Sequence, residues 1–193
     1  MANFDPAYMK TMGFEGGYGD DPNDAGGETY KGISRVYNPS WSGWKVIDAK
    51  KSELGFPKNL DTDQELLANV KSFYKANYWD VNLLDSFTEQ DVAEELFDTG
   101  VNLGVVRAAT FLQQSLNYLN RNGSLYEDIV EDGKIGKKTM KVMGIYLEHD
   151  KPTYLLKVLN VLQGMHYLSY MKKSPTQEKY TRGWFSRVEI SKK

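Results

Sequence analysis

The chain has 193 residues, of which 40% are hydrophobic and 26% are charged, a composition typical of a soluble globular protein. Its net charge of −2 gives no general reason to expect a nucleic-acid partner, which would favour a strongly basic surface. The charge is uneven, because residues 1–30 carry six acids and one lysine (−5) while residues 171–193 carry seven bases and two acids (+5). We interpret the basic C-terminal stretch as a solvated helix end.

The sequence contains no cysteine, which excludes disulfide bonds, thiolate metal sites and a cysteine nucleophile. The two histidines, His149 and His166, lie too far apart for a zinc motif, and we expect no metal or organic cofactor. His166 stands in an apolar helical pattern and is expected to be a satisfied core residue, whereas His149 is expected at the surface at a helix end. The first ten residues lack the charged-then-apolar order of a signal peptide, and no apolar run approaches the ~20 residues of a membrane span. We therefore expect a protein that is made in the cytoplasm without a signal peptide and does not insert stably into a membrane.

The first predicted element is a helix near the N-terminus. Asp5 at the N-cap and Pro6 in the first turn predict its start, and Gly16 predicts its end after about Glu15. Residues 16–60 are rich in Gly, Pro, Asn and Asp and predict a long loop region with a short hairpin at residues 30–36.

Regular helices follow the loop region. The capping-box pattern from Thr62 to Glu65 predicts a helix that reaches about residue 78. Apolar residues at helical spacing predict a further helix at 90–120, in which Gly100 and Gly104 either let neighbouring backbones come close or break the helix. Helices are also predicted at 135–148, 153–172 and 177–189. The fold class is therefore mainly α, and residues 120–134 form either a boundary between two lobes or one loop within a single fold.

The loop region opens with F-E-G-G-Y-G-D-D-P-N-D-A-G-G-E-T-Y-K-G, residues 14–32, which suits a structural turn, a metal loop or a carboxylate pair. A calcium loop that starts at Asp21 would need a third ligand at Ala25 and a glutamate at Gly32, so the match to that motif fails. The remaining alternatives are a turn-rich connector with solvated acids and a pair of catalytic carboxylates.

Glu15 and Asp24 are the candidate carboxylates. Glu15 falls at a predicted helix C-terminus, where the macrodipole disfavours an anion and raises the pKa of a carboxyl, as a general acid requires. Asp24 follows nine residues later on a glycine-rich loop that can fold back towards Glu15, and Asp21 competes with it for that role. Thr29 adds a hydroxyl that can position water. Two carboxylates on either side of a bond are the shared requirement of glycoside hydrolysis.

Candidate substrate-binding residues lie in two places. Aromatic rings cluster around the loop, and Tyr18 and Tyr30 are candidates to lie against the apolar faces of sugar rings, with core packing as the alternative. Asp98 and Asn102 stand four apart on an apolar helix and therefore share a face. They either form an internal hydrogen-bond network or line the floor of a cleft.

Several stretches together resemble a known family. E-G-G-Y at 15–18 and D-P-N-D-A-G-G-E-T-Y-K-G-I at 21–33 resemble glycoside hydrolase family 108, the peptidoglycan muramidases of phages and bacteria that include proteins labelled secretion activators. The resemblance continues, in the order of the family, in Y-W at 78–79, F-D-T-G-V-N-L-G at 97–104 and R-G-W-F-S-R-V at 182–188. D-G-K-I-G-K-K-T at 132–139 is similar to the signature of a helical peptidoglycan-binding segment.

The resemblance implies a lysozyme-like fold with a catalytic region at 1–96 and a helical peptidoglycan-binding region at 97–193, packed as one compact unit. It implies cleavage of the β-1,4 bond between N-acetylmuramic acid and N-acetylglucosamine, with Glu15 as general acid. A looser similarity to phage lysozymes selects Asp24 and Thr29, although the threonine comes one residue earlier than in that pattern. The family's pattern also differs at Gly19, where a hydrophobic residue is frequent, and at Glu28, where a small residue is usual. The negative charge of Glu28 can raise the pKa values of its neighbours, and the alternatives are that Glu28 binds substrate or faces solvent.

The resemblance implies peptidoglycan glycan strands as a partner, together with a holin or secretion apparatus that releases the protein to the bacterial cell wall. We expect no nucleic-acid partner. Two rival hypotheses share the fold. One is a wall-binding or secretion-associated module without turnover, and the other is a lytic transglycosylase, which needs a single acid/base and leaves an anhydro product.

Overall fold

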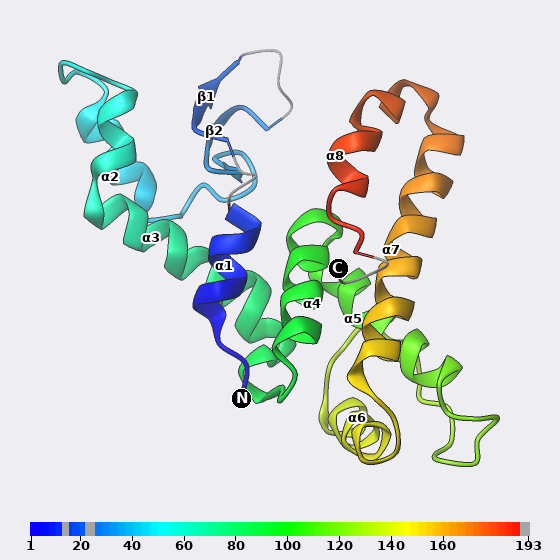
Figure 1. Cartoon of the computed structure of the whole chain (residues 1–193). Helices are drawn as coiled ribbons and strands as arrows, with labels where there is room; N and C mark the ends of the chain where they lie inside the picture. The colour runs from blue at the N-terminus through cyan, green and yellow to red at the C-terminus, as the bar shows by residue number, and fades with distance from the viewer. Residues whose placement is uncertain (13–15, 22–25, 190–193) are drawn as a thin grey trace. The chain divides into compact units, whose positions relative to one another are not determined.

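The structure, a computed structural model, describes residues 1–12, 16–21 and 26–189 (Figure 1). The chain divides into two compact units. Phe4–Asn77 form the first, which we call the N-terminal unit, and Met1–Asn3 with Tyr78–Lys193 form the C-terminal unit. Both units are built mainly from helices, and one small sheet lies in the N-terminal unit. The prediction of a mainly α fold with a short hairpin is thereby confirmed.

The N-terminal unit combines three helices with a three-stranded antiparallel sheet of order β1-β2-β3. In chain order its elements are α1 (Phe4–Met12), β1 (Tyr18–Asp20), β2 (Glu28–Tyr30), β3 (Ile33–Ser34), α2 (Gly43–Lys50), the 3-10 helix η1 (Lys58–Thr62) and α3 (Gln64–Tyr74). The predicted first helix begins at Phe4, one residue before the expected cap, and its expected end near Glu15 falls outside the described residues.

The hairpin between β2 and β3 is set by its two-residue turn. Lys31 and Gly32 both have positive φ angles, 44° and 77°, as the tight hairpin turns that match strand twist require. Tyr30 then pairs with Ile33, and Tyr18 of β1 pairs with Tyr30 from the other side. The hairpin predicted at residues 30–36 is confirmed, and β1 adds a third strand that the sequence pattern did not indicate.

The prediction that residues 16–60 form only a loop with a hairpin is wrong at α2. Trp44 and Ile47 are three residues apart, and both are buried, so a short helix forms to bury that pair. The capping prediction for the next helix is also shifted by one residue. Asp63, not Thr62, accepts the hydrogen bond from the backbone N–H of Leu66, at 2.8 Å. After α3 the chain continues in a π-helical turn, η2 (Lys75–Trp79).

The C-terminal unit is helical in its described part. Its elements after residue 79 are the 3-10 turns η3 (Asp80–Asn82) and η4 (Leu84–Ser86), helices α4 (Gln90–Leu103), α5 (Val105–Tyr118), α6 (Lys137–His149) and α7 (Pro152–Lys173), the 3-10 helix η5 (Pro175–Tyr180) and α8 (Thr181–Phe185). Helices α4, α5 and α7 pack against one another around fully buried Leu96, Phe97 and Leu112. None of the helices in the described ranges combines the length and the apolar character that a membrane span requires.

The helix predicted at 90–120 is two helices, because it breaks at Gly104. Gly104 has a φ of 92°, a conformation that costs a side-chain-bearing residue free energy, and its N–H caps α4 by donating to the carbonyl of Gly100. A Cβ at Gly100 would meet Val105 at 3.6 Å, so the two helices approach closely where they meet. Both alternatives noted for the glycine pair are therefore present.

The loop before α6 is held by the side chain of Gln113. Its amide nitrogen donates to the carboxylate of Asp132 (2.8 Å) and to the carbonyl of Lys134 (3.1 Å), while its amide oxygen accepts from the N–H of Gly133 (2.8 Å). The glycine has a φ of 70°, and a Cβ there would lie 2.5 Å from Cγ1 of Val106. The D-G-K stretch is thus a turn clamped onto α5.

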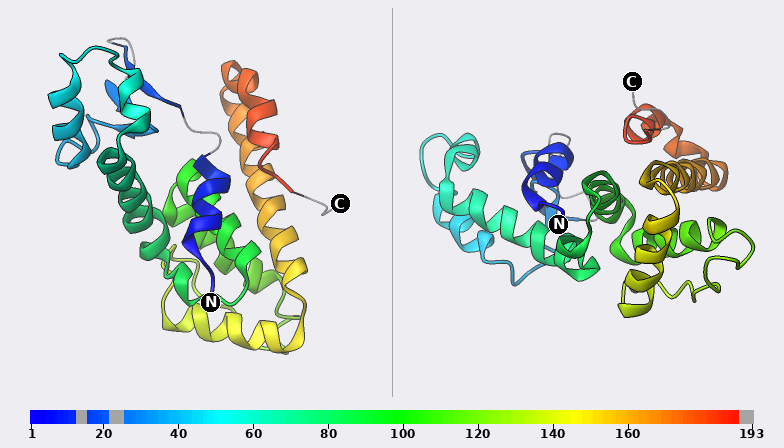
Figure 2. Two further views of the ribbon diagram at one scale, coloured as in Figure 1. Left: turned by 60° about the vertical axis from the view of Figure 1, so that its left-hand side comes forward. Right: turned by 60° about the horizontal axis from the view of Figure 1, so that its bottom comes forward.

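The helix predicted at 177–189 is short, since only Thr181–Phe185 are α-helical and η5 precedes them. This segment folds back along the C-terminal half of α7 (Figures 1 and 2). Trp184 stacks on Tyr167 of α7 with ring centroids 5.2 Å apart and planes 12° apart. Packing of this aromatic pair, not helical periodicity, fixes the path of the segment.

Candidate active site

The two predicted catalytic carboxylates stand next to the paired strands β1 and β2 in the sequence. Glu15 precedes β1 in the sequence and Asp24 lies in the connection between β1 and β2, and both fall outside the described residues. The described strands pair in a fixed register, with Gly19 opposite Thr29 and Asp20 opposite Glu28. These strands and the side chains that contact them form the described part of the site.

Thr29 lies on β2, half-buried, directly across from Gly19. A Cβ at Gly19 would come within 3.2 Å of the Thr29 hydroxyl oxygen. The hydroxyl makes no hydrogen bond to any residue in the described ranges. The glycine that departs from the family's pattern therefore leaves room beside this hydroxyl.

Glu28 is the centre of an ion network. Its carboxylate, whose side chain is 9% exposed, accepts hydrogen bonds from Arg35 (2.6 Å) and from the Tyr18 hydroxyl (3.0 Å), and Lys51 lies 2.9 Å away. Arg35 also makes a two-pronged contact with Asp48 of α2, at 2.7 and 2.5 Å. The network joins the hairpin to α2.

These contacts set the protonation states of the network. Burial would raise the pKa of Glu28, but hydrogen bonds from Lys51, Arg35 and Tyr18 outweigh burial and lower it. The hydrogen bond from Arg35 likewise lowers the pKa of Asp48 to about 2. Both carboxylates are ionised at neutral pH, so Glu28 is unsuited to act as a general acid, and two adjacent cations balance its charge.

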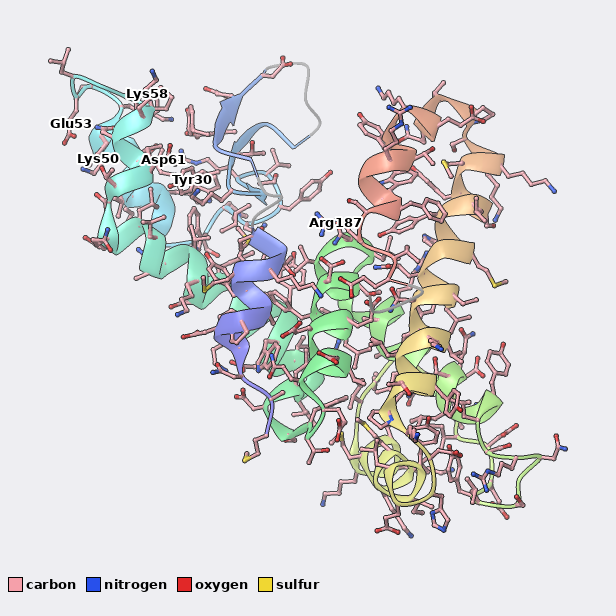
Figure 3. All side chains as sticks on the ribbon, viewed as in Figure 1. Tyr30, Lys50, Glu53, Lys58, Asp61 and Arg187 are labelled. Atoms are coloured by element: carbon pink, nitrogen blue, oxygen red, sulfur yellow. The ribbon has the colours of Figure 1, made fainter. Side chains whose placement is uncertain are left out.

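Tyr18 and Tyr30 face each other across the β1–β2 pair but have different surroundings. Tyr18 is half-buried, packs edge-on against Phe56 with centroids 4.8 Å apart, and has its pKa raised to about 12 by burial and by its hydrogen bond to Glu28. Tyr30 is fully buried, and its hydroxyl donates to the carbonyl of Leu60 in η1, next to Asp61 (Figure 3). A fully buried ring presents no face to a sugar, so Tyr30 belongs to the core beneath the hairpin. Core packing was the alternative interpretation of this residue.

Asp98 and Asn102 lie on α4 in the C-terminal unit, as the helical spacing predicted. Arg187 forms an ion pair with the Asp98 carboxylate at 2.6 Å and lies beside α4 (Figure 3). The amide nitrogen of Asn102 donates to the backbone carbonyl of Asp98 at 2.8 Å. The internal network weighed for these residues is thus present, and whether they also contact substrate stays a prediction.

Two groups of polar residues were not anticipated from the sequence. Arg35 and Lys51 hold Glu28, but their pairing depends on the fold of the hairpin against α2 and has no local signature. In the C-terminal unit, Glu95 is only 9% exposed and accepts hydrogen bonds from Thr99 (3.2 Å) and Asn160 (3.1 Å). An acid on the apolar face of a predicted helix is the signal that could have revealed it.

The two histidines have different surroundings. His149 is exposed at the C-terminal end of α6, as expected. His166, expected to be a satisfied core residue, is only half-buried on α7 and contacts Arg107. Across the ranges that the structure describes, no three His, Cys, Asp or Glu side chains gather as a metal site would require.

Comparisons with known proteins identify both parts of the chain. Residues 8–104 match the family model described as Glycosyl hydrolase 108, and residues 107–189 match a model described as Predicted Peptidoglycan domain. Among solved structures, the chain is similar to that of SagA from Brucella abortus, with a TM-score of 0.57 and 24% identity over 96% of this chain and 88% of the other. No curated protein matches the chain.

The structural similarity supports the lysozyme-like, mainly α fold, and the model matches extend over the hairpin and the D-G-K turn described above. A glycosidase model that covers the hairpin, followed by a peptidoglycan-domain model, indicates an enzyme of the cell wall. The chain belongs to the glycosyl hydrolase 108 family and is a glycoside hydrolase that acts on peptidoglycan.

Proposed function

We propose that the protein is an N-acetylmuramidase that cleaves the β-1,4 bond between N-acetylmuramic acid and N-acetylglucosamine. The observation that supports the proposal is that Glu15, Asp24 and Thr29 fall within the residues that match the glycosidase family, while Glu28, close to them in the sequence, is already paired with two cations. Since Glu28 is engaged, we assign the acid–base work to Glu15, which precedes β1 in the sequence, and to Asp24, which falls between β1 and β2.

In this proposal Glu15 is protonated before reaction and donates its proton to the glycosidic oxygen as the bond to the anomeric carbon breaks. Asp24 stabilises the positive charge that develops at that carbon or directs a water molecule to it, and Asp21 is the competing candidate. The Thr29 hydroxyl positions the water. Addition of water at the anomeric carbon gives a reducing muramic-acid end and returns a proton to Glu15.

Substrate contacts are proposed for Tyr18 at the hairpin and for Asp98 and Asn102 on α4. The division into a catalytic region at 1–96 and a peptidoglycan-binding region at 97–193 also stays a prediction. Release to the wall through a holin or a dedicated secretion apparatus belongs to the same proposal.

The test is digestion of purified peptidoglycan by the wild type and by Glu15→Gln, followed by reduction and mass spectrometry of the new ends. We expect reducing muramic-acid ends from the wild type and a loss of at least about 100-fold in rate for the variant. Glu65→Gln, an equal change at an exposed residue of α3, serves as the control and should retain activity.

Two other outcomes would replace the proposal. Anhydro ends would identify a lytic transglycosylase, which needs only one acid/base. An absence of products from every variant, under conditions in which a reference lysozyme works, would favour a wall-binding module without turnover.

A further inference from the structure

A pocket of about 500 Å³ lies in the C-terminal unit, whereas the hairpin with the candidate residue Thr29 belongs to the N-terminal unit. Its walls come from the start of α5 and from one residue of α7. The lining residues that matter here are Val106, Arg107, Phe111, Gln114 and His166. All belong to the C-terminal unit, so the pocket is formed within one compact body.

Arg107 gives the pocket a positive charge, and the ring of His166 lies against its guanidinium. The guanidinium nitrogen Nη1 of Arg107 lies 2.8 Å from Nδ1 and 2.7 Å from Nε2 of the imidazole. A cation this close requires a neutral ring, and burial, Arg107 and Lys173 all lower the pKa of His166. The imidazole therefore supports the guanidinium without neutralising it.

No acid in the described part of the chain pairs with Arg107. Glu131 contacts the lining residue Gln114, and both of its carboxylate oxygens are already hydrogen-bonded. Its two carboxylate oxygens accept hydrogen bonds from the amide nitrogens of Gln114 (3.0 Å) and Asn117 (3.1 Å). A guanidinium suits the bidentate recognition of carboxylates and phosphates, so one without an acidic partner at a pocket is a candidate anion-binding group.

Val106 and Phe111 supply apolar walls to the pocket, beside the polar side chains of Thr110 and Gln114. Val106 is 62% exposed, and Gly133 packs closely against its side chain, since a Cβ at Gly133 would lie 2.5 Å from Cγ1 of Val106. The Phe111 ring lies 6.3 Å from the His166 ring, measured between centroids. A ligand that matches these walls therefore combines an anionic group with a small apolar group.

We propose that this pocket binds a carboxylate of the peptide stems of peptidoglycan. The glycan strand offers hydroxyl and acetamido groups, whereas the stems carry free carboxylates beside alanine methyl groups. A guanidinium binds a carboxylate through two parallel hydrogen bonds, and Val106 and Phe111 can contact the methyl group. This inference rests on the proposed function, in that it takes peptidoglycan as the substrate, and adds a contact point in the C-terminal unit.

The experiment measures binding without hydrolysis. Stem peptides released from peptidoglycan by an amidase are titrated into the full-length wild type, Arg107→Gln and Arg121→Gln, by calorimetry or NMR. Arg121 is the matched control, because it also belongs to the C-terminal unit and its exposed ion pair with Asp150 contributes little to stability. We expect Arg107→Gln to raise the Kd about tenfold and Arg121→Gln to leave it unchanged.

A second arm uses the same peptides with their carboxyl groups converted to amides, which should bind the wild type about as weakly as the free acid binds Arg107→Gln. Equal affinity of the wild type and Arg107→Gln for the free acid would overturn the proposal. So would binding of a glycerol-phosphate polymer, but not of the peptide, in an Arg107-dependent manner, since that would assign the pocket to another anionic wall polymer.

Thermal melting checks that the variants are folded, and we expect that they are, because Arg107 is exposed. The peptide has no glycosidic bond, so its binding is independent of the digestion assay. Digestion without peptide binding would reject only this inference. Peptide binding without digestion would reject only the proposed muramidase activity.

Discussion

Glu28 illustrates how a single residue can be misjudged from its sequence context. It stands in the loop-rich stretch near the proposed catalytic acids, where an additional negative charge could raise the pKa values of its neighbours. The fold instead gives Glu28 two cations and a tyrosine hydroxyl. Its charge is balanced locally, and its role is to attach the hairpin to α2.

Replacement of Glu28 by glutamine should therefore destabilise the protein. The variant loses the ionic contacts with Arg35 and Lys51, and we expect a loss of about 1–3 kcal/mol in the free energy of unfolding at neutral pH. Urea denaturation measures this loss. Asp61→Asn removes an exposed pair with Lys31 at 3.7 Å and should cost less than about 1 kcal/mol.

The same residue predicts a pH dependence. The folded-state pKa of Glu28 is lowered, so its contribution to stability is present above its ordinary pKa near 4.5 and is lost as the pH falls through the lowered value. The difference in unfolding free energy between the wild type and Glu28→Gln should shrink as the pH falls below that range. A difference that stays constant down to pH 2 would contradict the assignment.

At the scale of elements, the D-G-K turn shows that a family signature can be structural. The stretch matches the peptidoglycan-domain pattern, yet Gly133 is pressed against Val106 and Gln113 hydrogen-bonds the residues on both sides of it. The turn supports Val106, which lines the pocket on α5.

Gly133→Ala should be strongly destabilising, because the new Cβ would lie 2.5 Å from Val106 Cγ1 at a φ of 70°. We expect a loss of about 2–4 kcal/mol. Gly144→Ala is the control, since a Cβ there, within α6, meets nothing within 4 Å and should stabilise the helix by roughly 0.5–1 kcal/mol. Thermal melting compares the two, and equal melting temperatures would reject the packing argument.

The elements that the sequence predicted well are those with long helical periodicity. The helices at 137–149 and 152–173 lie within a few residues of their predicted bounds, because apolar spacing over several turns is a strong signal. α2 and β1 were missed, because elements of eight and three residues form through packing and strand pairing with distant partners. The short path of residues 177–189 depends on the Trp184–Tyr167 stack, which periodicity cannot reveal.

At the scale of the whole molecule, each unit has its own buried core and its own ionic contact between distant segments. In the C-terminal unit, the pair of Asp98 and Arg187 joins α4 to the segment after α8, with side chains only 18% and 10% exposed. The R-G-W-F-S-R-V stretch therefore supplies both an aromatic ring and a charge that close the C-terminal unit.

Arg187→Gln should lower the stability of that unit. Removal of one partner leaves a largely buried carboxylate without its cation, and we expect a loss of about 3 kcal/mol. Hydrogen exchange should accelerate in α4, α7 and α8, with little change in the β1–β2 hairpin. Arg182→Gln, at an exposed position five residues earlier, should change the exchange by little. Uniform acceleration across both units would show that their stabilities are tightly coupled.

The candidate site was predictable in kind but not in detail. Thr29 lies on a strand just before the predicted hairpin, and Tyr18 lies on a strand that the sequence pattern did not indicate. Burial removed Tyr30 from the surface, and an ion pair engaged Asp98, because both outcomes depend on partners that are 30 and 89 residues away. Patterns within a few residues can suggest a chemistry, whereas burial and pairing are decided by the fold.

The hydrogen bonds of Gln113 have a consequence for the design of variant libraries. Glutamine and glutamate have nearly the same shape, so a ranking by size would treat Gln113→Glu as one of the mildest changes in the chain. The replacement would put a carboxylate where an amide now donates to Asp132 and to the carbonyl of Lys134. Two acceptors would then face a group that has no hydrogen to offer. Tolerance at this position depends on the two amide hydrogens that Gln113 donates, a property that neither side-chain volume nor hydrophobicity describes.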